Sequence, residues 1–136
     1  MFVNSLYVVT AVIEAGAGLA LLCLPSSAAK LLLGTPLLEP SACAVARVGG
    51  AGLLTIGVAC WLARSDTQSS AARGLVSAMV IYNLAVVLVL GAAGLQFQQV
   101  GVILWPAVVL HTVMTAWCIV SLRNPSIADR LGSLQQ

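Results

Sequence analysis

Residues 5–24 read SLYVVTAVIEAGAGLALLCL, and this long apolar stretch decides the fold. A helix needs about 20 residues to cross the hydrocarbon core of a bilayer. Three more apolar runs of similar length follow, at residues 42–63, 72–94 and 100–122. None shows the strict alternation of polar and apolar residues that is typical of membrane β-strands. The sequence therefore predicts an all-α, polytopic membrane protein, with residues 1–136 forming a single four-transmembrane-helix domain.

The composition excludes a soluble globular protein and a nucleic-acid-binding protein. Of the 136 residues, 60% are hydrophobic and 7% are charged, and the mean hydropathy is +1.05. A soluble domain usually has about a quarter of its residues charged, because these residues cover its surface. The net charge is only +2, and no basic cluster could follow a phosphate backbone. The expected partner is the lipid bilayer, with no nucleic acid.

Basic residues near the predicted helix ends indicate the orientation. With four spans, the N-terminus, the second connection and the C-terminal tail lie on one side, and these segments hold Arg64, Arg73, Arg123 and Arg130. The connections on the other side hold Lys30 as their only basic residue. Arginine and lysine near span ends favour the cytoplasmic side. Both termini are therefore expected in the cytoplasm, in a multi-pass protein of a bacterial-type inner (plasma) membrane.

Three further signals concern the first connection, the start of the fourth span and the C-terminal tail. Residues 25–34 begin with Pro25 and end with Gly34, which predicts a short helix at the outer membrane surface, with Lys30 pointing outward. Pro106 lies one to two turns into the fourth predicted span, which indicates a kink or a late helix start. In the tail, residues 127–134 are expected to form one amphipathic turn or to stay loose.

Small residues indicate where helices touch. Ala42, Ala46 and Gly50 recur at every fourth position of the second span, and Gly16 and Gly18 lie on the first. Such rows let helix backbones approach closely, because packing replaces the hydrophobic driving force between helices in lipid. The pattern predicts packing within the chain. Assembly into a homo-oligomer or a larger membrane complex stays open.

Each predicted span carries one strongly polar residue in the middle or outer half of the membrane: Glu14, Arg47, Asn83 and His111. Burying a charge in hydrocarbon is costly, so these side chains are expected to face the bundle interior and one another. Glu14 and Arg47 are both long enough to form an ion pair. The candidate ligand-binding residues are Glu14, Arg47, Asn83, His111, Tyr82 and Thr115.

Two interpretations of this polar set compete. In one, the residues form a satisfied hydrogen-bond network that only fixes helix register. In the other, Glu14 and His111 exchange protons or bind the head of an amphipathic ligand, with Arg47 as an anion partner. Three ionisable residues inside the spans of a chain with six basic and four acidic residues favour the second interpretation. Glu14 and His111 are therefore the catalytic candidates, although no reaction is assigned.

Other chemistry has weaker support. The single histidine, with no HExxH motif, argues against a metal site, and axial haem ligation by His111 with Met114 nearby is the alternative left open. No cofactor is evident, and a bound quinone or lipid stays open. Cys23 and Cys43 are expected at the same outer end, where they either form a disulfide or remain two apolar thiols.

The second span resembles a known family. Its segments ARVGGAGLL (46–54) and WLAR (61–64) are similar to the arginine- and glycine-bearing helices of DoxX-like small four-helix membrane proteins. The order of a long outer connection, a short inner connection and a fourth helix is similar too, so the resemblance covers most of the chain. It implies a subunit of a quinone-linked enzyme or an assembly factor, and it transfers no site residue.

The chain also resembles small multidrug resistance transporters in its length, its four spans and the glutamate in its first span. In that family the glutamate couples protons to cationic substrates, but Arg47 and His111 would repel cations here. We therefore rank three functions. The first is a membrane protein whose polar interior binds a quinone-like or lipid-like molecule. The second is a non-catalytic assembly or accessory subunit with a purely structural polar cluster, and the third is a proton-coupled transporter.

Overall fold

The structure, a computed structural model, describes residues 2–66 and 69–123, and in this part helices are joined by short loops. The helices are α1 (Phe2–Cys23), α2 (Pro25–Leu33), α3 (Pro40–Ala63), α4 (Ser70–Leu95) and α5 (Leu104–Arg123). All except α2 are long and apolar enough to cross a membrane. The predicted all-α architecture with four spans is confirmed. The tail, with Arg130 and the turn expected at 127–134, lies outside the described residues.

Local sequence explains where two of the spans begin. α4 starts before the predicted residue 72, because the Ser69 side chain accepts a hydrogen bond of 3.1 Å from the backbone N–H of Ala72. α5 begins at Leu104 rather than at residue 100, so Pro106 lies in its first turn. Proline is tolerated there, because its missing N–H would have no helical partner in any case. Of the two alternatives for Pro106, the late start is confirmed.

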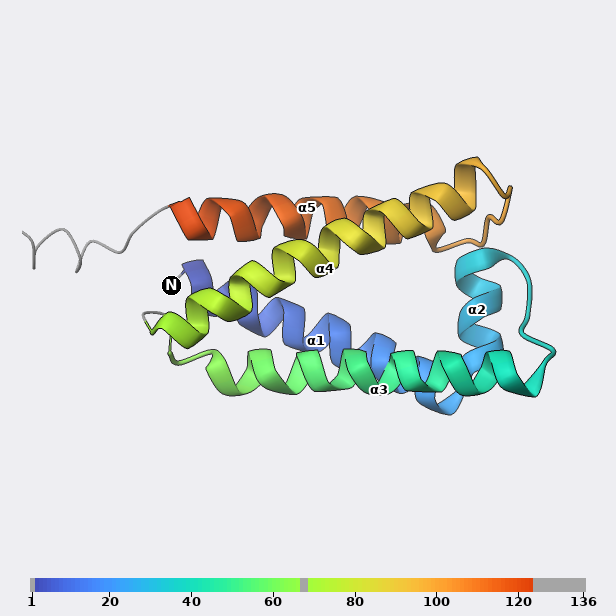
Figure 1. Cartoon of the computed structure of the whole chain (residues 1–136), viewed down its shortest axis with the longest axis horizontal. Coiled ribbons are helices and arrows are strands. Elements are labelled where there is room, and N and C mark those ends of the chain that lie inside the picture. Colours follow the sequence, from blue (N-terminus) through green and yellow to red (C-terminus); the bar gives the residue numbers. More distant parts are fainter. Residues whose placement is uncertain (1, 67–68, 124–136) are drawn as a thin grey trace, which may run out of the picture.

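The short helix predicted at residues 25–34 is confirmed as α2. It lies across one end of the four long helices, and the N-terminus lies at the opposite end (Figure 1). The helix stops at Gly34, which has a left-handed φ of 80° and donates its N–H to the Lys30 carbonyl at 3.0 Å. Pro25 and Ala29 are buried, whereas Lys30 is exposed as predicted.

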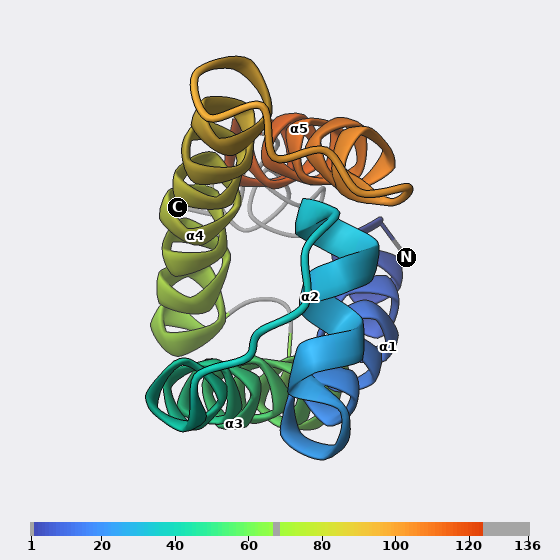
Figure 2. The same cartoon turned by 90° about the vertical axis from the view of Figure 1, so that its right-hand side faces the viewer.

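The loop before α5 is hydrogen-bonded to α2. Gly101 N donates to Leu32 O, and Ile103 N donates to Leu31 O, both at 3.1 Å. A side chain at Gly101 would overlap the Leu31 carbonyl, so this close approach requires glycine. Seen from this end, α2 runs from the side of α1 and α3 toward α5 (Figure 2).

The four spans form two closely packed pairs, α1 with α3 and α4 with α5 (Figure 1 and Figure 2). α1 and α3 approach backbone to backbone. A Cβ atom at Gly50 would lie 2.7 Å from the Gly18 carbonyl oxygen, and one at Gly57 would lie 2.9 Å from the Ala15 nitrogen. Gly52, in contrast, has nothing within 4 Å of its Cβ position. The prediction that small residues pack α3 within the chain is confirmed at Gly50.

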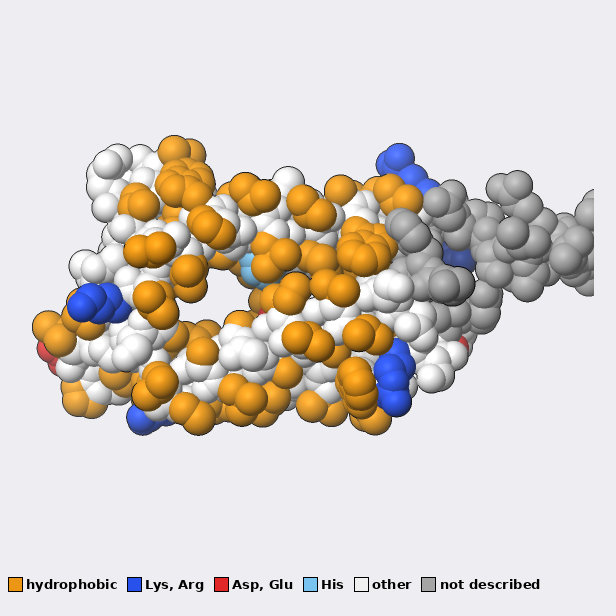
Figure 3. Space-filling view, turned by 180° about the vertical axis from the view of Figure 1, so that it is seen from behind, with side chains coloured by type: hydrophobic (Ala, Val, Ile, Leu, Met, Phe, Trp, Pro, Cys, Tyr) orange, Lys and Arg blue, Asp and Glu red, His pale blue; other side chains and the backbone are white. Residues whose placement is uncertain are grey.

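The two pairs meet mainly in the half of the bundle that holds the N-terminus. The buried core cluster there comprises Leu6, Tyr7, Ala11, Cys60, Ala72, Val76, Met79, Met114 and Cys118. Tyr7 has no exposed surface, and its hydroxyl donates to Ala72 O at 2.7 Å, which joins α1 to α4. In the half toward α2 the pairs diverge, and Figure 3 shows an opening between them. This opening positions the candidate site.

Candidate functional site

A chain of polar contacts joins α1, α4 and α5 at the middle of the bundle. The Tyr82 hydroxyl donates to Glu14 Oε2 at 2.9 Å. The Tyr82 and His111 rings meet edge to face, with centroids 5.8 Å apart and an interplanar angle of 83°. His111 Nδ1 lies 2.7 Å from Asn83 Oδ1. The structure thus brings together Glu14, Tyr82, Asn83 and His111 from the predicted set.

The hydrogen bonds of Asn83 determine which nitrogen of His111 carries the proton. Asn83 Nδ2 donates to Met79 O at 2.7 Å, so Oδ1 is the acceptor that faces the imidazole. His111 Nδ1 must therefore donate, and in the neutral ring Nε2 then presents a lone pair. Nε2 has no hydrogen-bond partner among the described residues. His111 is thus a hydrogen-bond acceptor whose orientation is set by an amide.

The cluster is buried between the helices and borders the opening. Glu14 is 3% exposed and Asn83 is 2% exposed, whereas Tyr82 and His111 are half-buried. Figure 3 shows the histidine side chain in pale blue at the edge of the opening, with orange hydrophobic side chains around it. A cavity lined mainly by apolar groups, with a few oriented polar groups, is the usual form of a small-molecule site.

Two threonines near the cluster differ in their partners. Thr115 Oγ1 donates to the His111 carbonyl at 2.8 Å, so it is satisfied within α5 and makes no side-chain bond to the cluster. Thr10 lies one turn before Glu14 on α1, is 2% exposed, and its Oγ1 has no hydrogen-bond partner in the described part of the chain. An unpaired buried hydroxyl costs about 1–3 kcal/mol. Thr10 is therefore a functional candidate absent from the predicted set, although its spacing from Glu14 places it on the same helix face.

Arg47 does not join the cluster, and the predicted ion pair with Glu14 is not formed in the described part of the chain. The Arg47 side chain is exposed, and its Nε donates to Leu22 O at 3.2 Å. Leu22 lies in the last turn of α1, where backbone carbonyls lack helical partners. A cation there also faces the negative end of the helix dipole. Arg47 therefore caps α1, and Glu14 is bonded to Tyr82 instead.

The cysteines take no part in this cluster. All four are free thiols, so Cys23 and Cys43 form no disulfide in the structure. The Cys43 thiol donates instead to Leu37 O at 3.7 Å. Across residues 2–66 and 69–123, no group of three His, Cys, Asp or Glu side chains is placed to hold a metal ion.

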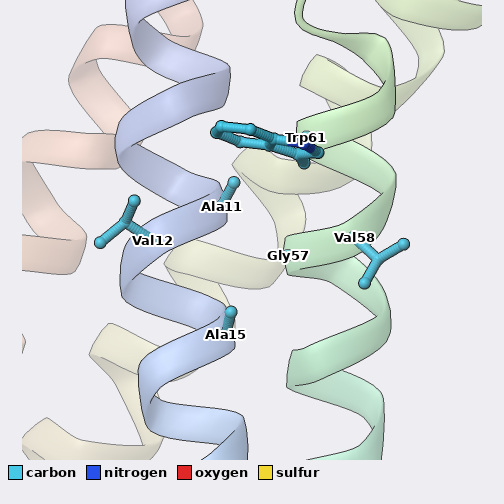
Figure 4. Close-up of a pocket in the computed structure, with 6 residues that line it drawn as sticks. All are labelled: Ala11, Val12, Ala15, Gly57, Val58 and Trp61. Atoms are coloured by element: carbon cyan, nitrogen blue, oxygen red, sulfur yellow. The ribbon is translucent and has the colours of Figure 1, made fainter.

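A second feature lies between α1 and α3. It is an apolar groove of about 340 Å³, which Figure 4 shows with its lining residues Ala11, Val12, Ala15, Gly57, Val58 and Trp61. The Trp61 ring extends from α3 toward α1 across one end of the groove (Figure 4). The Arg64 guanidinium lies 4.3 Å from the centroid of that ring. Sequence reasoning missed this groove, because its small apolar lining residues look like those of any span.

The comparisons with known proteins leave the family open. No protein-family description matches the chain, and neither curated proteins nor solved structures show significant similarity to it. The likeness to DoxX-like proteins stays a prediction from the sequence.

Proposed function

We propose that this small multi-pass membrane protein binds a quinone-like or lipid-like molecule in the opening between its helix pairs. The observation that carries the proposal is the His111 imidazole, which Asn83 holds at 2.7 Å while Nε2 has no partner among the described residues. A polar group without a partner inside a membrane is costly. A ligand that donates a hydrogen bond to Nε2 would remove this cost.

A hydroquinone head has the groups that this site requires. One phenolic O–H would donate to His111 Nε2, while the ring would lie against the Tyr82 ring. Glu14 Oε1, the carboxyl oxygen that Tyr82 does not use, would accept from the second O–H. The apolar tail would lie among the hydrophobic side chains around the opening. A lipid with a hydroxyl or amine head offers the same donors, so the shared requirement is a hydrogen-bond donor on an apolar tail.

The same pair of residues would carry any proton transfer. An imidazole held by a hydrogen bond at one nitrogen and free at the other is the arrangement of a general base. His111 and Glu14 therefore remain the proposed proton-transfer residues, with Asn83 as a positioning residue. The resemblance to DoxX-like proteins supports a place in a larger quinone-linked complex.

An accessory subunit without a ligand is the second candidate. Glu14 and Asn83 already have partners within the chain, Tyr82 and Met79 O, as a cluster that only fixes helix register would need. This function gives no role to His111 Nε2 or Thr10 Oγ1, neither of which has a partner among the described residues. We rank it second for that reason.

Analysis of co-purified molecules tests the proposal. Protein purified in mild detergent should retain a quinone or lipid molecule, identified by solvent extraction and mass spectrometry, and His111→Asn should lower this retention. Thr112→Val is the matched control and should leave retention unchanged, because this exposed neighbour of His111 donates its hydroxyl to Val108 O within α5, at 2.8 Å. Folded wild-type protein that carries no such molecule and binds no added hydroquinone would falsify the proposal.

The proposed orientation has its own test. Arg64, Arg73 and Arg123 lie at the same end of the bundle as the N-terminus, so we expect both termini in the cytoplasm. A reporter enzyme that is active only outside the inner membrane should give no signal when fused to the C-terminus. The same reporter fused after residue 98, beyond α4, should give a strong signal. The opposite pattern contradicts this orientation.

A further inference from the structure

We propose a second binding site, in which the groove between α1 and α3 holds an acyl chain of an anionic phospholipid and Arg64 binds its phosphate. The groove is lined by Ala11, Val12, Ala15, Gly57, Val58 and Trp61, all of them apolar or amphipathic. Close packing at Gly57 makes its floor, since a Cβ there would meet the Ala11 and Ala15 backbones at 3.0 and 2.9 Å. This site is separate from the central opening and does not depend on its ligand.

The groove has a cation at one end. Arg64 follows Trp61 by three residues, about 4.5 Å along the helix axis, at the end of α3. Its guanidinium stacks on the Trp61 ring at 4.3 Å, and its Nη1 donates to Trp61 O. Asn4 on α1 donates to Arg64 O at 2.9 Å, which holds the two helix ends together. The remaining guanidinium N–H groups form a planar fork that matches the geometry of a phosphate.

The order of these groups along α3 matches the order within a phospholipid. Arg64 lies at the end of the span, where phosphates lie, and the groove runs from Trp61 toward the middle of the helix (Figure 4). Tryptophan rings favour the boundary between head groups and acyl chains. A single acyl chain would therefore lie on Ala15 and Gly57 while its phosphate contacts Arg64.

The shape of the groove favours a lipid over a helix from a second copy of the chain. A helix with its side chains is about 10–12 Å wide and would need a continuous open face. The Trp61 ring crosses the groove at one end, where it would obstruct a packed helix (Figure 4). The positive charge of Arg64 also complements a phosphate better than it complements an apolar helix face.

The test compares an anionic phospholipid with a zwitterionic one. The full-length protein in detergent is titrated with phosphatidylglycerol or phosphatidylcholine of the same acyl composition, and bound lipid is counted by native mass spectrometry. One arginine near a phosphate should give about a fivefold preference for phosphatidylglycerol. Arg64→Gln should abolish this preference. Arg73→Gln, which removes an exposed arginine from the start of α4, should retain it.

Two measurements keep the test decisive if Arg64→Gln does not fold. Raising the salt concentration should remove the preference of the wild-type protein, because the contact is electrostatic. Phosphatidylglycerol with brominated acyl chains should quench tryptophan fluorescence, and Trp61→Phe should lose the quenched component. The proposal is overturned by equal binding of both lipids, by a preference that survives Arg64→Gln or high salt, or by quenching that Trp61→Phe leaves unchanged. A stable dimer that excludes lipid from the groove overturns it too.

Discussion

His111→Asn should weaken the binding of a hydroquinone by about 5–30-fold while the protein stays folded. The substitution removes the acceptor that Asn83 orients, and one hydrogen bond to a partner that is otherwise unpaired is worth about 1–2 kcal/mol. Asparagine is uncharged and polar, and its shorter amide lies near the position of Nδ1, so it can still bond to Asn83 but places no acceptor at the Nε2 position. The measurement is a titration of detergent-solubilised protein with a short-tailed hydroquinone, at matched amounts of folded protein.

Two variants separate a binding role of His111 from a purely structural one. Thr112→Val should bind like the wild type, because the exposed Thr112 donates its hydroxyl to Val108 O within α5. Asn83→Ala should also weaken binding, since it releases the imidazole from its fixed orientation. Wild-type binding by both His111→Asn and Glu14→Gln would favour the accessory-subunit function instead.

Gly50→Val should cause a large loss of stability, because it lies in the close contact of α1 with α3. A Cβ atom at this position would lie 2.7 Å from Gly18 O and 2.9 Å from Leu22 N, and these backbone atoms cannot rotate away as a side chain could. The two helices would have to separate, which costs about 1–3 kcal/mol for overpacking and more if the pair comes apart. Thermal unfolding in detergent, followed by circular dichroism, should show a clearly lower midpoint.

Gly52→Ala is the matched control for that prediction. It lies on the same helix only two residues away, but its Cβ position has nothing within 4 Å. Alanine also favours the helical conformation over glycine. The unfolding midpoint of Gly52→Ala should therefore equal or exceed that of the wild type. Equal midpoints for Gly50→Val and Gly52→Ala contradict the packing described for α1 and α3.

Much of the fold can be predicted from the sequence. A bilayer sets the length of each apolar run and requires its backbone polar groups to be hydrogen-bonded within the span, which favours helices. The short helix α2 is readable too, since Pro25 and Gly34 mark its two ends. The sequence does not predict the first residue of α5. Pro106 permits a helix to begin before it, and the backbone bonds of the loop to α2, which hold that start at Leu104, join segments far apart in the chain.

The site can be predicted only in part, because it too depends on contacts between segments that are far apart in the chain. Depth in the membrane correctly groups Glu14, Asn83 and His111, because polar side chains in spans are expected to face one another. Depth does not predict the partner of Arg47. Its side chain bonds to the Leu22 carbonyl and not to the Glu14 carboxyl group. The rotation of each helix about its axis depends on packing at glycines such as Gly18 and Gly50. The pattern of polar and apolar residues alone does not predict that rotation.

The most direct test of the central opening as a ligand site is nitrogen NMR of the imidazole. The chain has one histidine, so labelling with ¹⁵N-histidine gives two ring signals, both from His111. Without ligand, Nδ1 should be protonated and Nε2 unprotonated, as the bond to Asn83 requires. A bound hydroquinone should shift the Nε2 signal strongly and leave the protonated Nδ1 signal nearly unchanged. An Nε2 signal that stays the same at saturating hydroquinone, or a proton found on Nε2 rather than Nδ1, contradicts the proposed site.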